Sequence, residues 1–435
     1  MVHLSLPLLA GALATLSTAL PVREPSQLTF SAAPSVSLRS QLNLSALEAL
    51  PLSELAQLEQ HIARFTEKRL VKLAEDAEPL EITEGEKALL VFSGKRFIDV
   101  TADDDTSMAV QSSEPFPKKL VYNTKALQPL FDRISLAHMK KFLSSFSGFR
   151  TRYYRSSEGK QSQQFLLGQI KEISSSNEHV KVKVSEFEHS WGQNSIIVRF
   201  NPAESAKKSD QVVIIGKPGA SHAVLVIKCQ STRAPQSFDD STNLLPFLGA
   251  PGADDDGSGT TSLLETFRTL VNASFVPSTY PVELHWYSAE EGGLLGSKAI
   301  AQAYAREARK VRAMLQMDMT AWVKEGTKPT VGLIQDYVSA EFTDYLGSII
   351  NEYSEIGFTP TTCGYACSDH SSWSSNGYPS AFTIESTFED SNHNIHSTKD
   401  TIDYSSEFSF EHMAQFTRVA IALAVELGGG ASVVA

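Results

Sequence analysis

Four clusters in the sequence carry the residue types that bind divalent metal ions. Neighbouring carboxylates repel one another, so a group of them requires a compensating cation. A histidine among oxygen ligands favours zinc or another borderline divalent metal over calcium or magnesium. The stretches are "PGADDDGSG" with Asp254, Asp255 and Asp256, "SAEEGG" with Glu290 and Glu291, "MDMT" with Asp318, and "FEDSNHNIHSTKDT" with His396. Together they predict a metal centre, provided that the fold brings them to one place.

The elements around these clusters indicate how they would meet. Apolar runs such as "QVVIIG", "VELHWY" and "RAMLQM" predict strands, and they alternate with helical patterns such as "GTTSLLETFRTLV". This alternation predicts an α/β fold, with a mixed, centrally parallel β-sheet flanked by helices on both faces. Function in such folds gathers in the loops beyond the carboxyl ends of the strands. Every cluster follows a predicted strand or precedes a predicted helix, so we expect them to converge.

Each cluster also has a simpler interpretation when it is taken alone. Runs of acids are usually solvated faces, and His396 alone would be a surface-loop residue. Asp254 and Asp256 would then only cap the following helix near its positive end. His285, inside "VELHWY", is most simply a histidine of the core or of a sheet edge. Only the order and the context of the clusters together favour a shared site.

Composition and charge limit the class of protein. The chain has 435 residues, 42% of them hydrophobic, with a formal net charge of -12 and a pI near 5.5. It can bury a large core, and it lacks the basic surface that neutralises phosphates, so nucleic acid is not an expected partner. No run approaches the length of a membrane span.

The N-terminal hundred residues differ from the rest. An apolar run followed by small residues predicts a signal peptide at residues 1–19, and hence a secreted, extracellular protein. Sequons at Asn43 and Asn272 are compatible with secretion. Residues 20–102 have a charged helical pattern and contain the dibasic pair Lys95-Arg96, so we interpret them as a removable helical prosegment; a helical domain that stays attached is the alternative. The remaining residues, 103–435, would form the catalytic domain.

The chain has three cysteines, and their spacing leaves one over. In an oxidising compartment "CGYAC" could close a small disulfide loop between Cys363 and Cys367, since a turn can bring the two sulfurs together. Cys229 would then lack a partner, which is unusual in a secreted chain.

From about Ser144 to the C-terminus, the sequence resembles the secreted two-zinc leucine aminopeptidases of bacteria and fungi. The matching stretches, in that family's order, are "APGADDDGSG", "YSAEEGGLLGS", "MDM", "CGYACSDHSSW" and "FEDSNHNIHSTKDT". The N-terminal segment resembles the inhibitory prosegment of the fungal enzymes, including its "RFIDVT" end. The resemblance implies a zinc exopeptidase fold, two zinc ions per chain, and peptide substrates that begin with leucine or another bulky apolar residue.

The resemblance also implies roles for single residues. Asp255 would bridge the two metal ions, Glu291 and His396 would complete the first zinc site, and Asp318 would serve the second. Glu290 would be the general base that accepts a proton from the attacking water. A further set would act from one loop: Tyr365 would help to hold the transition-state oxygen, Cys363 and Cys367 would form the family's disulfide, and "SDHSSW" would help to line the pocket.

The match breaks at one metal ligand. The family has a histidine in "GAHxDS" straight after a strand, whereas here "QVVIIG" runs into an atypical insertion near residues 217–239. Alignment on Asp240-Ser241 places Phe238, which cannot ligate zinc, at the histidine position. Three explanations compete: the insertion is a translated intron, His222 inside it is a substitute ligand, or the insertion is real and the second zinc is weak or absent.

These observations predict a secreted zinc aminopeptidase, expected to be a monomer. Two other functions remain open. A glutaminyl cyclase-like enzyme would need only one zinc, and Asp255, Glu291 and His396 would suffice to hold it. A degenerate binding protein on a hydrolase scaffold would follow if the missing histidine abolished metal binding.

Overall fold

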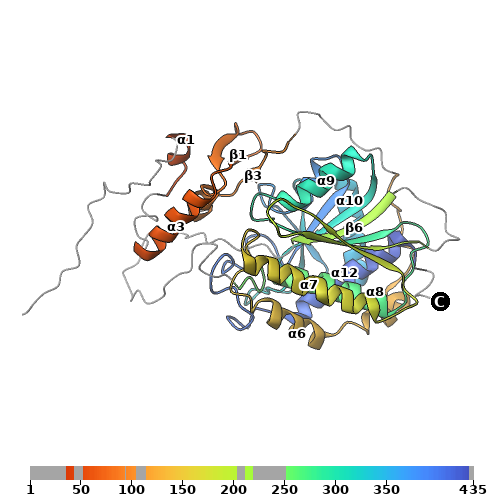
Figure 1. Cartoon of the computed structure of the whole chain (residues 1–435). Helices are drawn as coiled ribbons and strands as arrows, with labels where there is room; N and C mark the ends of the chain where they lie inside the picture. The colour runs from red at the N-terminus through yellow and green to blue at the C-terminus, as the bar shows by residue number, and fades with distance from the viewer. Residues whose placement is uncertain are drawn as a thin grey trace, which may run out of the picture.

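A computed structural model describes residues 36–43, 52–93, 95–103, 114–202, 211–218 and 251–430. A small N-terminal unit, red to orange in Figure 1, is followed by a large α/β unit. The predicted signal peptide, the centre of the insertion, Phe238, His222 and Cys229 lie outside the described residues. In the parts of the chain that are described, no helix has the length and apolar character that a membrane span needs.

A mixed sheet forms the centre of the large unit (Figure 1). Within the described residues it has eight strands in the order β10-β9-β11-β8-β6-β7-β5-β4. Strands β11, β8, β6 and β7 run parallel to their neighbours in this central group, whereas β4, β5 and β9 make antiparallel pairs. The bounds are β4 Val182–Phe187, β5 Ser195–Phe200, β6 Gln211–Pro218, β7 Val282–Tyr287, β8 Lys310–Met317, β9 Val331–Ile334, β10 Phe358–Thr361 and β11 Ser380–Ile384. The predicted mixed, centrally parallel sheet is confirmed.

Helices cover both faces of this sheet, as the sequence predicted. On one face Phe267 of α8 and Phe416 of α12 share a core with Val213 of β6. On the other face Ile300 of α9 packs in a second cluster with Ile214, the next residue of β6, because successive strand side chains point to opposite faces. The bounds are α5 Thr124–Phe131, α6 Leu136–Phe146, α7 Ser157–Ser175, α8 Gly257–Asn272, α9 Leu295–Arg306, α10 Ala340–Tyr353, α11 His370–Ser374 and α12 Phe410–Gly428.

The small unit is not only helical, which corrects the prediction for residues 20–102. Its described elements are α1 Val36–Arg39, α3 Leu52–Arg64, β1 Lys68–Lys72, β2 Leu80–Thr83, α4 Lys87–Phe92 and β3 Ile98–Asp99. The strands form an antiparallel sheet in the order β2-β1-β3, and Leu58, Val71, Ile82 and Leu89 make a small core of its own. These strands have two to five residues, too few for a period-two pattern to stand out beside the leucine spacing of α3.

The small unit contacts the turn that follows β7. The Lys87 ammonium donates to the carbonyl oxygen of Gly292 at 2.9 Å, and the Asp99 amide donates to the carbonyl oxygen of Gly293 at 3.3 Å. Gly293 has a φ of 99°, and a Cβ placed there would lie 2.6 Å from the amide nitrogen of Asp99. Glycine is therefore required here, both for the backbone conformation and for the close approach of the small unit.

Candidate metal centre and active site

The predicted site residues lie beyond the carboxyl ends of the central strands. Asp255 lies two residues before the start of α8, and Glu290 and Glu291 lie in the turn between β7 and α9. Asp318 follows the last residue of β8, and His396 lies in the loop between β11 and α12. The sheet thus delivers all four sequence clusters to one edge, as its parallel centre predicts.

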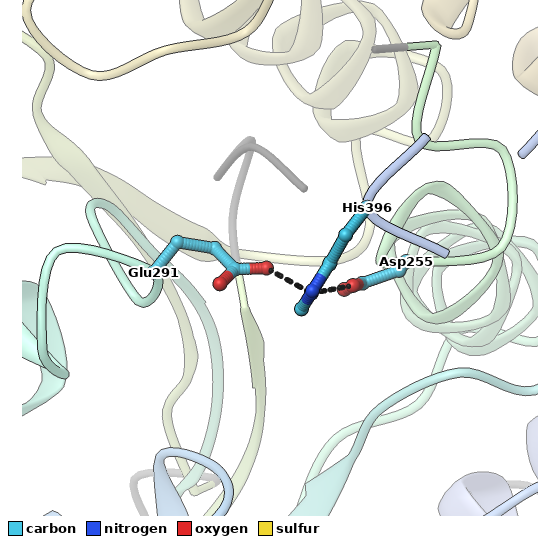
Figure 2. Close-up of side chains that lie close together, drawn as sticks. All are labelled: Asp255, Glu291 and His396. Atoms are coloured by element: carbon cyan, nitrogen blue, oxygen red, sulfur yellow. Dashed lines mark ion pairs between the residues drawn. The ribbon is translucent and has the colours of Figure 1, made fainter. Parts of the chain in front are cut away.

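Three of these side chains converge on a common point, as Figure 2 shows. The Nε2 atom of His396 lies 2.8 Å from Oδ2 of Asp255 and 3.0 Å from Oε1 of Glu291. One ligand atom from each residue lies within 4.8 Å of the other two. Asp255 and His396 are buried, with 8% and 4% of their surface exposed, so water screens their charges weakly.

The electrostatics of this group favour a bound cation. Burial lowers the pKa of His396, but Glu291 and Asp255 more than offset this and raise the pKa to about 9. A positive charge between the two carboxylates is therefore stabilised. Two carboxylate oxygens and one imidazole nitrogen are a ligand set that zinc accepts at catalytic centres, where three protein ligands leave a position for substrate or water. The residues fit a zinc ion.

The acids on either side of Asp255 have structural roles. Asp256 caps α8, because its Oδ1 accepts a hydrogen bond from the Gly259 amide at 2.9 Å. Asp254 is fully buried, and its carboxylate accepts from the Ala321 amide and the Asn392 side chain at 3.2 and 3.0 Å. The capping interpretation therefore holds for Asp256, and only the middle acid belongs to the group of three.

Asp318 is not part of the group formed by Asp255, Glu291 and His396. Its Oδ2 accepts a hydrogen bond from the Ser368 hydroxyl at 2.6 Å. Burial raises the pKa of Asp318 well above its usual value, and the neighbouring charges of Asp256 and Asp255 add to the rise. The Asp318 carboxylate is thus surrounded by other acidic side chains.

Glu290 lies next to Glu291 in the same turn but is not one of the three converging side chains. Burial raises its pKa well above the usual value, and so do the nearby charges of Glu291 and Asp369. A cation bound by Glu291 would oppose this rise and favour the ionised, basic form of Glu290.

One pocket is lined both by Glu291 and His396 and by residues of the loop that carries the two cysteines. In the structure a disulfide links Cys363 to Cys367, and Tyr365 lies between them in the sequence. The free space is about 40 Å³, which holds only a few water molecules. The lining residues are Val91, Lys95, Arg96, Phe97, Glu290, Glu291, Leu294, Tyr365, Ala366, Cys367 and His396. Residues of the small N-terminal unit therefore line part of this pocket.

Sequence reasoning did not find the residues that hold Asp255 in place. The Asp400 carboxylate accepts hydrogen bonds from the amides of Asp254 and Asp255 at 2.8 and 3.0 Å. The buried Arg152 guanidinium donates to the carbonyl oxygens of Pro251 and Gly252. Asp400 closes the stretch "HSTKD", so a further acid beside His396 was the available signal. Arg152 lies far from every cluster in the sequence, and no pattern marks it.

Other sequence predictions meet the structure in different ways. His285 is fully buried and pairs with Glu283 at 2.9 Å, which agrees with a core histidine. The sequon residue Asn272 is exposed at the end of α8, and Asn43 is partly exposed. Exposure is what a glycosylation site requires, so both sequons stay predictions.

Comparison with known proteins identifies relatives over most of the chain. The profile of Peptidase family M28 matches residues 237–421. Leucine aminopeptidase 1 of Coccidioides posadasii is 41% identical over 411 residues, which are 89% of this chain and 98% of that protein. Leucine aminopeptidase 1 of Neurospora crassa is 43% identical over 361 residues, which are 80% and 82% of the two chains.

Solved structures share the fold at lower identity. The LapA aminopeptidase of Legionella pneumophila has a TM-score of 0.67 at 22% identity, covering 85% of this chain and 96% of that one. An aminopeptidase from Aneurinibacillus has a TM-score of 0.51 at 14% identity, covering 71% of this chain and 98% of that one. With identities above 40% over at least four fifths of its length, the chain belongs to peptidase family M28.

Proposed function

We propose that this chain is a zinc-dependent aminopeptidase, which hydrolyses the N-terminal peptide bond of peptides. The observation that carries the proposal is the convergence of Asp255, Glu291 and His396, with Glu290 adjacent in the same turn. Membership of the family and the similarity to leucine aminopeptidases support the same reaction. Leucine is the expected N-terminal residue, because the relatives are leucine aminopeptidases.

Asp255, Glu291 and His396 would hold the zinc ion. When bound, zinc supplies Lewis acidity, which polarises a peptide carbonyl and makes water a better nucleophile at neutral pH. Asp400 would position Asp255, because its carboxylate accepts hydrogen bonds from the backbone amides of Asp254 and Asp255. Such support keeps a ligand in its binding geometry.

Glu290 would move the proton. Its carboxylate would accept a proton from the attacking water and then give it to the nitrogen of the breaking C–N bond. The products are a free amino acid and a peptide shortened by one residue. Tyr365, which lines the same pocket, would donate its hydroxyl hydrogen to the oxygen of the tetrahedral transition state.

The acidic character of the site accounts for the preference for a free N-terminus. The carboxylates of Glu290 and Glu291 line the pocket, and a protonated α-amine would be attracted to them. A blocked or internal peptide bond lacks that charge. We therefore expect exopeptidase and not endopeptidase activity.

Residues 1–19 and 20–102 would be a signal peptide and a prosegment, and the catalytic domain would span residues 103–435. Lys95 and Arg96 line the pocket, and the Arg96 guanidinium lies 5.9 Å from the centre of the Tyr365 ring. A peptide cannot occupy this space while the segment is present. The chain would thus be secreted as an inactive precursor, glycosylated at Asn43 and Asn272, and act as a monomer on peptides.

Activity measurements on a chain freed of residues 1–102 test the proposal. With zinc, it should release leucine from leucine amide, and Glu290→Gln should lower kcat by at least about 100-fold, since positioned general bases contribute 10²–10⁴-fold. Glu307→Gln, at an exposed glutamate just after α9, is the matched control and should keep full activity. A fully active Glu290→Gln variant would refute the assignment of the base. Cyclisation of an N-terminal glutamine without cleavage would point to a glutaminyl cyclase instead.

A further inference from the structure

We propose that the metal centre of this chain holds one divalent ion, and that the ammonium group of Lys217 serves as the fixed cation of the acidic pocket around Asp256 and Asp318. The inference rests on the proposed function, because it specifies the metal content of the same site. It departs from the two ions that the family resemblance implies.

Lys217 is placed where a cation is needed. It is the last but one residue of β6, and it is completely buried. Its Nζ lies 3.3 Å from Oδ2 of Asp256 and 3.4 Å from the carbonyl oxygen of the same residue, and it also donates to the Thr260 hydroxyl. Lysine is rarely buried unless it is paired, and here the contacts with Asp256 and Thr260 compensate the buried ammonium.

Asp318 lies within electrostatic range of the same ammonium, because its charge is among those that favour the protonated form of Lys217. The Oδ2 atom of Asp318 accepts a hydrogen bond from the Ser368 hydroxyl, whereas its Oδ1 has no hydrogen-bond partner in the described part of the chain.

The ligand inventory supports one ion. Among the described residues, the only group of three metal-type ligands is Asp255, Glu291 and His396. Three protein ligands suffice for a catalytic zinc. For a second ion Asp318 would need an imidazole nearby, and the aligned position holds Phe238. Sites made of carboxylate oxygens alone are typical of calcium, magnesium or manganese, whereas protein zinc sites usually include an imidazole or a thiolate.

Charge opposes a second ion as well. Asp255 and Glu291 carry two negative charges, which one dication balances. The Lys217 ammonium already compensates part of the charge of Asp256 and Asp318. A second dication would then have to enter beside a buried ammonium, where the low dielectric makes the repulsion strong.

Metal stoichiometry of the full chain is the direct test. Protein loaded with excess zinc and desalted should contain about one zinc per chain by elemental analysis. Asp318→Asn should leave this number unchanged, and His396→Ala should lower it towards zero. Two zinc ions in the unaltered chain, with one lost in Asp318→Asn, would overturn the proposal. Cobalt substitution gives an independent reading: a single Co²⁺ should show an uncoupled paramagnetic signal, and a spin-coupled pair would contradict it.

A lysine variant tests the role of the ammonium. Lys217→Ala removes the fixed charge, and the carboxylates of Asp256 and Asp318 should then take up an additional Mn²⁺, counted by paramagnetic resonance. Lys310→Ala, at an exposed lysine at the start of β8, is the control and should bind as the unaltered chain does. Equal Mn²⁺ uptake by a folded Lys217→Ala variant would refute the assignment. If that variant does not fold, the zinc count and the Asp318→Asn result still decide.

The two proposals fail in different ways. Two metal ions in a protein that releases leucine would remove the one-metal inference and leave the aminopeptidase assignment intact. One metal ion in a mature protein that releases no amino acid would support the one-metal inference and refute the aminopeptidase assignment.

Discussion

Buried carboxylates away from the metal ligands also depend on their neighbours, and Glu283 on β7 shows how. His285 contacts its Oε2 at 2.9 Å, the Tyr304 hydroxyl donates to the same oxygen at 2.8 Å, and Arg199 pairs with its Oε1. Burial raises the pKa of Glu283, but His285 and Arg199 outweigh burial and lower the pKa to about 2. The ionised form is thus the one that the folded chain prefers.

This environment predicts a change in stability with pH. Because the folded pKa is below the unfolded value, ionised Glu283 stabilises the fold fully above about pH 4.5, and this contribution is lost as the pH falls towards 2. The contribution is on the order of 3 kcal/mol, from a shift of between two and three pH units. Urea unfolding between pH 2.5 and 6 should show a shallower loss of unfolding free energy in Glu283→Gln than in the unaltered chain. The exposed Glu178→Gln variant should follow the unaltered chain. Identical pH slopes for all three proteins would contradict this account.

Single residues of the site could be predicted where a metal-binding residue type stood in a loop after a predicted strand. Asp255, Glu291 and His396 stood in acidic or histidine-containing loops after strands, and the structure brings them together. Asp318 was predicted to serve a second zinc ion and not the first, and it lies outside this group of three. Arg152 and Asp400 act through hydrogen bonds to the backbone before α8, and such contacts depend on tertiary packing that no local pattern encodes.

At the scale of elements, the contact between the small unit and the β7–α9 turn has a functional consequence. Lys87, the first residue of α4, pairs with Asp99 at 2.6 Å and with Glu84 at 3.3 Å, and it binds the Gly292 carbonyl. Gly292 directly follows Glu291, one of the three converging side chains. All three side chains are buried, so loss of the lysine would remove the ion pair of the buried Asp99 carboxylate, whereas Glu84 would keep its contacts with Arg69 and Arg155.

We therefore predict that Lys87→Met loosens the small unit from the pocket. The unprocessed variant should hydrolyse leucine amide several-fold faster than the unprocessed unaltered chain, because Arg96 and its neighbours would leave the pocket more often. Lys68→Met, at an exposed lysine of β1, should have no such effect. Gel analysis must show that both variants stay uncleaved. Equal rates for all three precursors would refute the coupling between Lys87 and pocket closure.

Long elements were predictable, and short ones were not. The apolar run of β7 and the amphipathic pattern of α8 both appear in the structure where the sequence placed them. The sheet of the small unit was missed because its strands are short. Helix α11 has five residues and lies in the predicted "SDHSSW" loop, and β10 has four; segments of this length carry too little periodicity to be recognised.

At the scale of the whole molecule, the parallel centre of the sheet explains why distant segments form one site. Loops after β7, β8 and β11 and the start of α8 all lie at the carboxyl edge of the sheet. The sequence predicted this edge from the alternation of strands and helices. It did not predict which side chains of the small unit enter the pocket, because that depends on how two separately packed cores meet.

Diffraction from crystals of the zinc-loaded chain, measured on both sides of the zinc absorption edge, shows whether these three residues bind the metal. An anomalous peak should appear about 2.0–2.2 Å from one atom each of Asp255, Glu291 and His396. A zinc peak that none of these three residues contacts, in protein that hydrolyses leucine amide, would contradict this prediction.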